Sequence, residues 1–291
     1  MFNKNKYEFF FFRLFAKLIT LISFERIKYI AKPLALLFYY VIPIRKKIVI
    51  TNLSLAFPEY SKKRIEQITF ENYYNFACTF LEMLSIPSLT NAYINSIAEC
   101  DRLDLINETL SKGKGMILFT AHFGNWELGA VYYGIILEKQ ITILAKRQRN
   151  RFVANWLKSM REKFGNREIM LGVSVRELFR TLNGGGIIGI VGDQRGPRKG
   201  MRVNFFNRPT AVFPGAASIA IKNNSPIMVV VMERQPDHSF KTYVEEIPLT
   251  NLPEDKSDKP REIIQRYMTI LENHVRRSPA QWFWMHNIWK Y

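Results

Sequence analysis

The N-terminal part of the chain spaces its apolar and charged positions as helices do. Residues 7–24 read YEFFFFRLFAKLITLISF, and a helical projection places Arg13 and Lys17 on one stripe while apolar side chains cover the rest. Further along, Ser61 is placed to cap a longer helix with apolar residues at helical spacing. The pattern predicts that residues 1–87 are mainly helical.

From residue 97 onward, short apolar runs alternate with amphipathic segments. The runs predict strands at 115–120, 141–146, 184–193, 226–234 and, near an edge, 240–247. The amphipathic segments predict helices at 150–165, 174–183, 214–224 and 259–279. This alternation indicates an α/β fold with a mixed, largely parallel sheet flanked by helices. We divide the chain into an N-terminal membrane-associated helical segment, residues 1–47, and an α/β domain, residues 48–291.

The charge balance narrows the partners. The chain has 42 basic and 25 acidic residues, a net charge of +17, which favours an anionic partner such as a nucleic acid, a membrane or a phosphorylated substrate. An aromatic content of 14% suits a membrane-associated protein better than a soluble nucleic-acid binder. The basic residues are not interleaved with aromatics as in an RNA-binding platform, so we expect no nucleic-acid partner. Cys78 and Cys100 form no disulfide framework and fit a reducing compartment.

The N-terminal apolar segment does not have the pattern of a spanning helix. A lysine near its centre, such as Lys17, costs about 2.5–3.5 kcal/mol on insertion scales. The next apolar run, residues 33–44, is shorter than the ~20 residues that a span requires. We therefore expect a helix that lies in the membrane interface with its lysines toward water. The alternatives are a buried helix and an uncleaved signal anchor; no small-residue cleavage site follows, so a removed signal peptide is not expected.

Common nucleotide, hydrolase and metal motifs are missing from the sequence. The glycine-rich stretch GGGIIG, residues 184–189, precedes its strand and therefore does not place a pyrophosphate at a helix N-terminus. There is no P-loop, no GxSxG and no HExxH, and the histidines are scattered. We expect no metal and no cofactor.

The stretch TAHFGNWELG, residues 120–129, carries the strongest chemical signal. His122 follows a buried strand, Asn125 can cap the helix that begins after it, and Glu127 lies in the first turn of that helix. Gly124 lets the chain turn sharply, so that the histidine and the glutamate can converge. Imidazole can take a proton from a hydroxyl group, and a carboxylate on its other nitrogen fixes the tautomer.

The chain offers no serine or cysteine nucleophile near this pair, which favours direct transfer of an acyl group from a carrier to an alcohol. The alternative interpretation is a strand-end histidine bonded to backbone, with Glu127 stabilised at the helix start by the helix dipole. Asp193 ends a buried strand and Arg195 follows it, so both should project beside His122. An arginine there can hold phosphate or stabilise an oxyanion; the alternatives are a turn residue and a solvated charge.

Residues 122–127 resemble the His-x4-Asp/Glu motif of the lysophospholipid acyltransferase superfamily, and more narrowly the bacterial lipid A late acyltransferases of the lauroyl/myristoyl type. The resemblance extends over nearly the whole chain. It includes residues 46–64, residues 192–220 and the C-terminal stretch PAQWFWMHNIWK, residues 279–290.

The resemblance implies that His122 is the general base and Glu127 its partner. It implies an acyl carrier protein thioester as the donor and a hydroxyl group of a lipid A precursor as the acceptor, typically on an attached 3-hydroxyacyl chain. The arginine of the family maps to Arg147, with Arg149 as the alternative, and the aspartate of the family maps to Asp193. The neighbouring Gln194, which replaces a histidine of some members, receives no role.

We therefore expect a membrane-associated O-acyltransferase on the cytoplasmic face of the inner membrane. Its substrate-binding residues would be Gly124, Asn125, Arg147, Asp193 and Arg195, with the oxyanion held by backbone amides of residues 123–125 or by Arg147. The alternatives are another glycolipid or glycerophospholipid as acceptor, coenzyme A as the carrier, hydrolysis, and a non-enzymatic basic module that binds membranes or nucleic acid.

Overall fold

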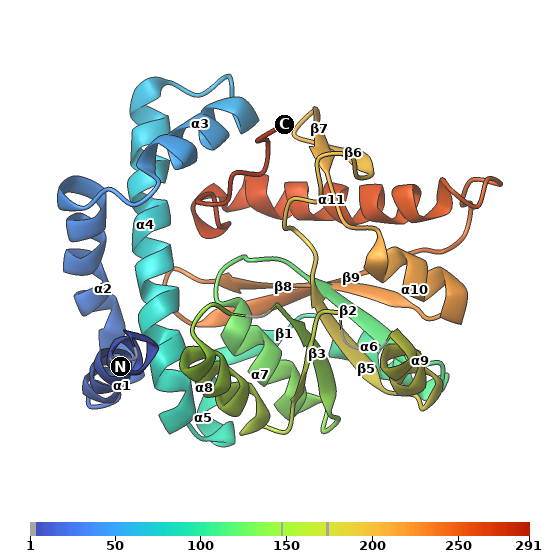
Figure 1. Cartoon of the computed structure of the whole chain (residues 1–291), viewed down its shortest axis with the longest axis horizontal. Coiled ribbons are helices and arrows are strands. Elements are labelled where there is room, and N and C mark those ends of the chain that lie inside the picture. Colours follow the sequence, from blue (N-terminus) through green and yellow to red (C-terminus); the bar gives the residue numbers. More distant parts are fainter. Residues whose placement is uncertain (1–3, 147, 173–174) are drawn as a thin grey trace.

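A computed structural model describes residues 4–146, 148–172 and 175–291 of the chain. At its centre is a seven-stranded sheet with the strand order β1-β9-β8-β2-β5-β3-β4 (Figure 1). The strands are β1 (Ala98–Cys100), β2 (Met116–Thr120), β3 (Ile141–Ala145), β4 (Arg167–Met170), β5 (Ile187–Val191), β8 (Ile227–Arg234) and β9 (Phe240–Ile247). All neighbours pair in parallel except β8 and β9, which are antiparallel. The mixed, largely parallel α/β fold expected from the sequence is confirmed.

Helices cover both faces of this sheet. In Figure 1, α10 (Gly215–Asn223) and α11 (Lys259–Arg277) lie above it, and α7 (Trp126–Ile136) lies below it. The remaining helices of this part are α5 (Asn91–Ile97), α6 (Leu103–Ser111), α8 (Arg151–Glu162) and α9 (Val175–Asn183). Alternate residues of β2 pack into different clusters: Met116 and Leu118 contribute to one, Ile117 and Phe119 to the other. A strand buried on both faces reads as a continuous apolar run, which is why β2 was recognisable.

The N-terminal residues are helical, as expected. They form α1 (Lys4–Ile19), α2 (Ile27–Leu36), the π-helical turn η2 (Leu37–Val41), α3 (Lys46–Ala56) and α4 (Lys62–Ser85). The hydroxyl group of Ser61 accepts a hydrogen bond from the backbone N–H of Arg64 and caps α4. The main hydrophobic core runs from Ala16 to Ile288, so these helices share it with the sheet. The domain division at residue 47 stays a prediction.

No helix in the described residues is long and apolar enough to cross a membrane.

Several elements were not predicted, among them α5, the strand β4 and a separate hairpin. The strand β4 lies at the edge of the sheet; it has only four residues, and polar side chains interrupt its apolar pattern. A separate hairpin, β6 (Arg202–Phe205) and β7 (Arg208–Ala211), lies in a stretch for which the sequence predicted no element. The strand β9 is near the edge, as expected, with the short β1 outside it.

Candidate active site

The topology of the sheet brings His122 and Asp193 together. β2 and β5 are parallel neighbours, and Thr120 at the end of one pairs with Val191 at the end of the other. His122 and Asp193 follow these paired residues at equivalent positions, beyond the carboxyl ends of their strands. This is the edge at which open α/β sheets place ligands and chemistry. The sequence expectation that Asp193 projects beside His122 agrees with this geometry.

Asp193 binds both the ring and the backbone of His122. Its Oδ1 lies 2.7 Å from Nδ1 of the imidazole, and its Oδ2 accepts the backbone N–H of His122 at 2.9 Å. Oδ2 also accepts the indole N–H of Trp282 at 2.8 Å. The carboxylate is buried, whereas the His122 side chain is 19% exposed. A carboxylate that accepts several N–H groups stays ionised, so the neutral imidazole carries its proton on Nδ1.

The electrostatics of the pair favour its charged form. Burial opposes protonation of His122, but the negative charge of Asp193 and the hydrogen bond to it outweigh burial and raise the pKa of the imidazole. Burial alone would raise the pKa of Asp193, but the charge of His122 and the N–H donors lower it. This pair can therefore accept a proton on Nε2 and hold the resulting imidazolium. Nε2 has no hydrogen-bond partner within the described part of the chain.

Gly124 and Asn125 build the turn between β2 and α7. Gly124 has φ of +54°, and a Cβ atom there would lie 2.0 Å from the backbone oxygen of Met232, so only glycine fits. The side chain of Asn125 accepts the backbone N–H of Leu128 and caps α7, as expected. The amide of Asn125 also donates to Glu82 at 2.8 Å, where the turn meets α4.

The carboxylate of Glu82 is itself part of a buried ion pair. The guanidinium of Arg234, on β8, donates to both of its oxygens, at 2.7 Å to Oε2. The hydroxyl group of Thr79 donates to the carbonyl oxygen of Gly124 at 2.8 Å. The turn that carries His122 is therefore held by hydrogen bonds to Thr79 and Glu82 of α4, and Glu82 is fixed in turn by its ion pair with Arg234 of β8.

Glu127 lies elsewhere than the sequence indicated. Its two carboxylate oxygens accept hydrogen bonds from the Nε and a terminal nitrogen of Arg161, at 2.9 and 2.6 Å. Arg161 also pairs with Glu168. Burial would lower the pKa of this guanidinium, but the two carboxylates outweigh burial and raise it.

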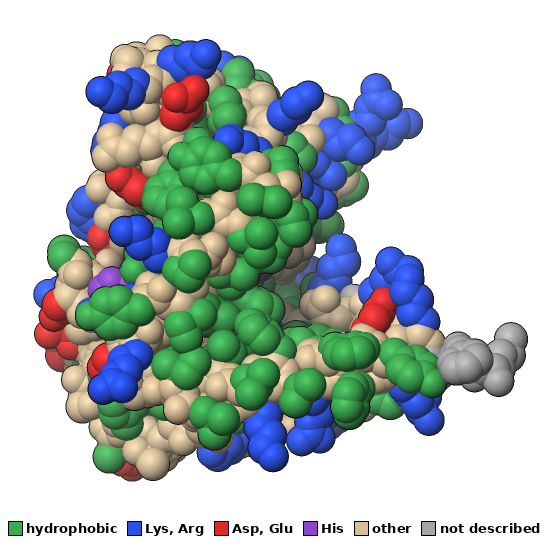
Figure 2. Space-filling view, turned by 90° about the vertical axis from the view of Figure 1, so that its left-hand side faces the viewer, with side chains coloured by type: hydrophobic (Ala, Val, Ile, Leu, Met, Phe, Trp, Pro, Cys, Tyr) green, Lys and Arg blue, Asp and Glu red, His purple; other side chains and the backbone are tan. Residues whose placement is uncertain are grey.

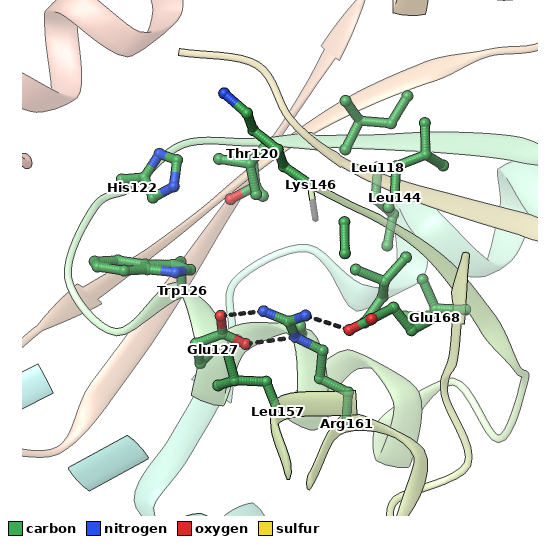
Figure 3. Close-up of a pocket in the computed structure, with 18 of the residues that line it drawn as sticks. Leu118, Thr120, His122, Trp126, Glu127, Leu144, Lys146, Leu157, Arg161 and Glu168 are labelled. Carbon is green, nitrogen blue, oxygen red and sulfur yellow. Dashed lines mark hydrogen bonds and ion pairs between the residues drawn. The ribbon is translucent and has the colours of Figure 1, made fainter. Parts of the chain in front are cut away.

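Both oxygens of Glu127 thus accept hydrogen bonds from Arg161 on α8, and Asp193, not Glu127, binds Nδ1 of His122. Figure 3 shows Trp126 between His122 and Glu127, with Glu127 directed at Arg161. The first turn of α7 directs this carboxylate toward α8, a long-range contact that the spacing of the motif does not reveal. Glu127 still affects the imidazole through space, because its negative charge contributes to the raised pKa of His122.

A cavity of about 310 Å³ opens beside His122. His122 and Thr120 lie at one side of it and the Glu127–Arg161 pair at another (Figure 3). Most of the remaining lining is apolar and comes from β2, β3, β8 and α7: Leu118, Ala130, Tyr133, Ile141, Ile143, Leu144 and Val230. The cavity can accommodate an apolar chain with one end at the histidine.

Arg195 contacts the C-terminal segment, which we define as residues 279–291. Its guanidinium donates to the backbone oxygen of Asn287 and lies 4.9 Å from the centre of the Tyr291 ring. Its backbone N–H donates to Nε2 of His286 at 2.9 Å, and burial lowers the pKa of His286 to about 4. An anion-binding role for Arg195 would require the guanidinium to leave this contact.

Two of the backbone N–H groups expected to bind the oxyanion already have acceptors within the protein. The backbone N–H of Phe123 donates to Ala121, and that of Gly124 donates to Gln281, so neither is free in this conformation. Arg147 lies outside the described residues. Arg149 is exposed, and Lys146, which the sequence did not single out, lies at the cavity beside Thr120 (Figure 3).

Sequence reasoning missed Arg161, Trp282 and the Glu82–Arg234 pair. From the sequence, the C-terminal stretch was only a block of resemblance; the indole of Trp282 packs in the core while its N–H binds Asp193. A buried tryptophan requires a hydrogen-bond acceptor, which was the one available signal. Arg161 gave no signal, because a basic residue on an amphipathic helix is ordinarily exposed.

Comparison with known proteins finds relatives that are lipid A biosynthesis acyltransferases. Over 249 residues the chain is 22% identical to the lipid A biosynthesis palmitoleoyltransferase of Escherichia coli strain K12, with 84% of this chain and 79% of that protein covered. The lipid A biosynthesis acyltransferase of Shigella flexneri matches with the same identity and coverage. The lipid A biosynthesis lauroyltransferase of Escherichia coli strain K12 is 22% identical over 248 residues, again with 84% and 79% covered.

The chain also matches the family of bacterial lipid A biosynthesis acyltransferases over residues 2–291. This match confirms the resemblance noted in the sequence, and it spans the helical N-terminal part, the His122 turn and the C-terminal segment. Because the match covers nearly the whole chain, the protein belongs to the bacterial lipid A biosynthesis acyltransferase family and is an acyltransferase.

Proposed function

We propose that this acyltransferase moves a fatty acyl group directly from an acyl carrier protein thioester to a hydroxyl group of a lipid A precursor, with His122 as the general base. The observation that carries the proposal is the position of His122. Its Nδ1 is held by a buried carboxylate at 2.7 Å, and the imidazole lies at the side of a largely apolar cavity.

The chemistry needs no nucleophile from the protein. Nε2 of His122 takes the proton of the acceptor hydroxyl as its oxygen attacks the thioester carbonyl carbon. The tetrahedral intermediate then collapses, the carbon–sulfur bond breaks, and the imidazolium returns its proton to the leaving thiolate. Asp193 stabilises the imidazolium between these steps, because it places a buried negative charge on Nδ1.

In this proposal Glu127 supports the base indirectly. It fixes Arg161 at the cavity and adds negative charge that favours the imidazolium. Lys146, at the cavity beside Thr120, is the described cation best placed to approach the oxyanion or a phosphate of the substrates. Arg147 follows it directly in the sequence and is proposed for the same role.

The acyl chain would occupy the apolar part of the cavity. A fatty acyl group requires a lining without charges beyond the thioester, and the side chains from β2, β3 and β8 provide one. The Glu127–Arg161–Glu168 cluster also reaches this cavity, where the guanidinium of Arg161 pairs with both carboxylates and leaves one net negative charge.

A membrane supplies the lipid acceptor in this proposal. We define the apolar face as the exposed apolar side chains of α1, α2, η2 and the residues next to them: Tyr7, Phe10, Phe11, Leu14, Phe15, Leu18, Leu21, Tyr29, Leu36, Leu37, Tyr40, Val41, Ile42 and Ile44. Figure 2 shows these apolar side chains gathered on one side of the molecule, bordered by lysine and arginine side chains. An exposed patch of this extent, rimmed by cations, is typical of a surface that docks on an anionic bilayer.

The direction of docking agrees with the substrates. The cytoplasmic face of the inner membrane brings an anionic glycolipid and an acidic carrier protein to the same enzyme, and a net charge of +17 attracts both. Docking on that face is part of the proposal.

The test uses purified full-length protein in detergent, a labelled acyl carrier protein thioester and a tetra-acylated lipid A precursor. Wild-type protein should transfer the label to the precursor, and His122→Ala should reduce transfer by at least about a thousandfold, because the general base is lost. Equal transfer by the two proteins would show that His122 is not the base.

Substrate variants separate the alternatives. Transfer from acyl coenzyme A at an equal rate would argue against a specific carrier protein. Transfer to a glycerophospholipid but not to the precursor would replace the acceptor while keeping the base. Release of free fatty acid through His122, without an acylated lipid, would indicate hydrolysis.

A further inference from the structure

The C-terminal segment reaches the catalytic pair directly. It follows α11 and crosses the end of the sheet, where the backbone N–H of Phe283 donates to the carbonyl oxygen of His122 at 3.0 Å. Trp282 forms an isolated antiparallel bridge with Phe123. The indole N–H of Trp282 then donates to Oδ2 of Asp193 at 2.8 Å. One residue of this segment therefore touches both the turn and the carboxylate behind the base.

The hydrogen bonds divide the work between the two oxygens of Asp193. Oδ1 faces Nδ1 of His122, and within the described residues Oδ2 accepts only from the indole of Trp282 and the backbone of residue 122. Trp282 is 1% exposed, so no solvent water competes for this bond. A neutral donor on Oδ2 fixes the carboxylate rotation and keeps it ionised without adding a positive charge that would oppose the imidazolium.

On the basis of the function proposed above, we propose that Trp282 is a positioning residue of the base. Its indole N–H holds Asp193 ionised and oriented, so that Oδ1 supports the imidazolium of His122. Trp282 acts through Asp193 and does not contact the substrate.

The C-terminal segment offers a matched control. Trp284 is equally buried, its ring lies 4.6 Å from that of Trp282, and its indole N–H also makes one hydrogen bond. That bond ends on the backbone oxygen of Pro279, away from the catalytic pair. Trp282→Phe and Trp284→Phe thus remove the same chemical group from the same segment, and only the first removes a donor from Asp193.

The experiment measures kcat, KM and the pH profile of acyl transfer for both variants, together with their melting temperatures. We expect Trp282→Phe to lower kcat on the order of tenfold or more with little change in KM, because one charge-assisted hydrogen bond is lost. We also expect the acidic limb of its pH profile to move from the wild-type position, because the indole N–H no longer withdraws charge from the carboxylate that faces the imidazolium. Trp284→Phe should lower the melting temperature alone.

Each outcome has a distinct meaning. If both variants melt earlier but keep the wild-type kcat and pH profile, Trp282 is only a packing residue and the inference is overturned. If Asp193→Asn and His122→Ala lower transfer strongly while Trp282→Phe does not, the inference alone fails. If those two variants retain full activity, the proposed function itself fails.

A measurement on folded protein covers the case in which Trp282→Phe does not fold. Tryptophan is labelled with nitrogen-15 in the Trp126→Phe background, because the ring of Trp126 lies 5.0 Å from that of His122 and would respond to it as well. One indole N–H resonance should then titrate with the midpoint of the acidic limb and lose this titration in His122→Ala. Absence of any such indole resonance would contradict the inference.

Discussion

At the residue scale, the His122–Asp193 pair depends on charges that burial would otherwise disfavour. Asp193 is 4% exposed, and it stays ionised only because N–H groups surround it and His122 faces it. The imidazole gains in turn, since the carboxylate raises its pKa against the effect of burial. Asp193, which the sequence indicated as a substrate-binding residue, thus lies where an orienting carboxylate is needed.

The first prediction concerns pH. His122 must be neutral to accept a proton, so kcat/KM should rise with pH through the pKa of the imidazole. Because Asp193 raises that pKa, the midpoint should lie above the ordinary value of about 6.5. Asp193→Asn removes the charge but leaves the burial, so its midpoint should move to lower pH while the maximal rate falls by at least about a hundredfold. Unchanged profiles would exclude Asp193 from the catalytic pair.

The second prediction concerns Glu127. Arg161→Gln should lower the free energy of unfolding by about 3 kcal/mol, because it leaves the buried carboxylates of Glu127 and Glu168 without a cation. Glu127→Gln should cost less, because Arg161 keeps Glu168 as a partner. The double variant should lose much less than the sum of the two. Thermal unfolding in detergent measures all three proteins. Glu108→Gln, which breaks an exposed pair with Lys112, is the control and should change little. Additive losses would contradict the coupling.

At the element scale, the turn between β2 and α7 is held from several sides. Asn125 caps α7 and binds Glu82, Thr79 holds the carbonyl group of Gly124, and the C-terminal segment binds the backbone of residue 122. The parallel pairing of β2 and β5 brings Asp193 to this turn. A helix from the N-terminal part, two strands and the C-terminus therefore all contribute to the position of one imidazole.

The third prediction tests that turn. Gly124→Ala should reduce transfer by at least about tenfold, because the new Cβ atom would overlap the oxygen of Met232 and displace the turn. Gly113→Ala is the control: Gly113 also has a positive φ, but nothing lies within 4 Å of its Cβ position. Both variants should lose about 1 kcal/mol of stability to backbone strain, and only Gly124→Ala should lose activity beyond that effect. Equal activity losses would mean that backbone strain alone decides.

At the scale of the whole molecule, the apolar face is bordered by basic side chains, as expected of a surface that contacts an anionic bilayer. The inner side of α1 packs on the protein through Phe12, Ala16 and Ile19, while Phe10, Phe11 and Leu14 remain exposed. A helix that is apolar on both sides, with Arg13 and Lys17 along one border, fits a position between the protein and a bilayer surface. The interfacial helix expected from the sequence has this form, and its contact with a membrane stays a proposal.

The fourth prediction tests the apolar face. Phe10→Ser combined with Phe11→Ser should weaken binding to vesicles that contain anionic lipid by about tenfold or more, because two large apolar side chains no longer enter the bilayer. Sedimentation with vesicles measures the binding. Phe213→Ser is the control, since Phe213 is 56% exposed but precedes α10, away from α1 and α2. Equal binding by all proteins would contradict docking through this face.

The sequence by itself determined the features that depend on neighbours along the chain. The apolar runs of β2, β5 and β8, the cap of α7 by Asn125 and the sharp turn at Gly124 all follow from local spacing and residue type. The family also followed, because three blocks of resemblance in the right order extend over nearly the whole chain.

Only the tertiary structure decided which side chains meet. The sequence predicted that Asp193 lies beside His122, but the pairing of its carboxylate with Nδ1 follows only from the tertiary structure. Trp282 lies 89 residues from Asp193, and no local pattern indicates their contact. The motif and the turn at Gly124 predicted that Glu127 lies at His122. In the structure α8 packs beside α7, and the carboxylate of Glu127 binds Arg161 instead. A hydrogen bond depends on distances of about 3 Å, and such distances between remote residues are determined by strand order and helix packing.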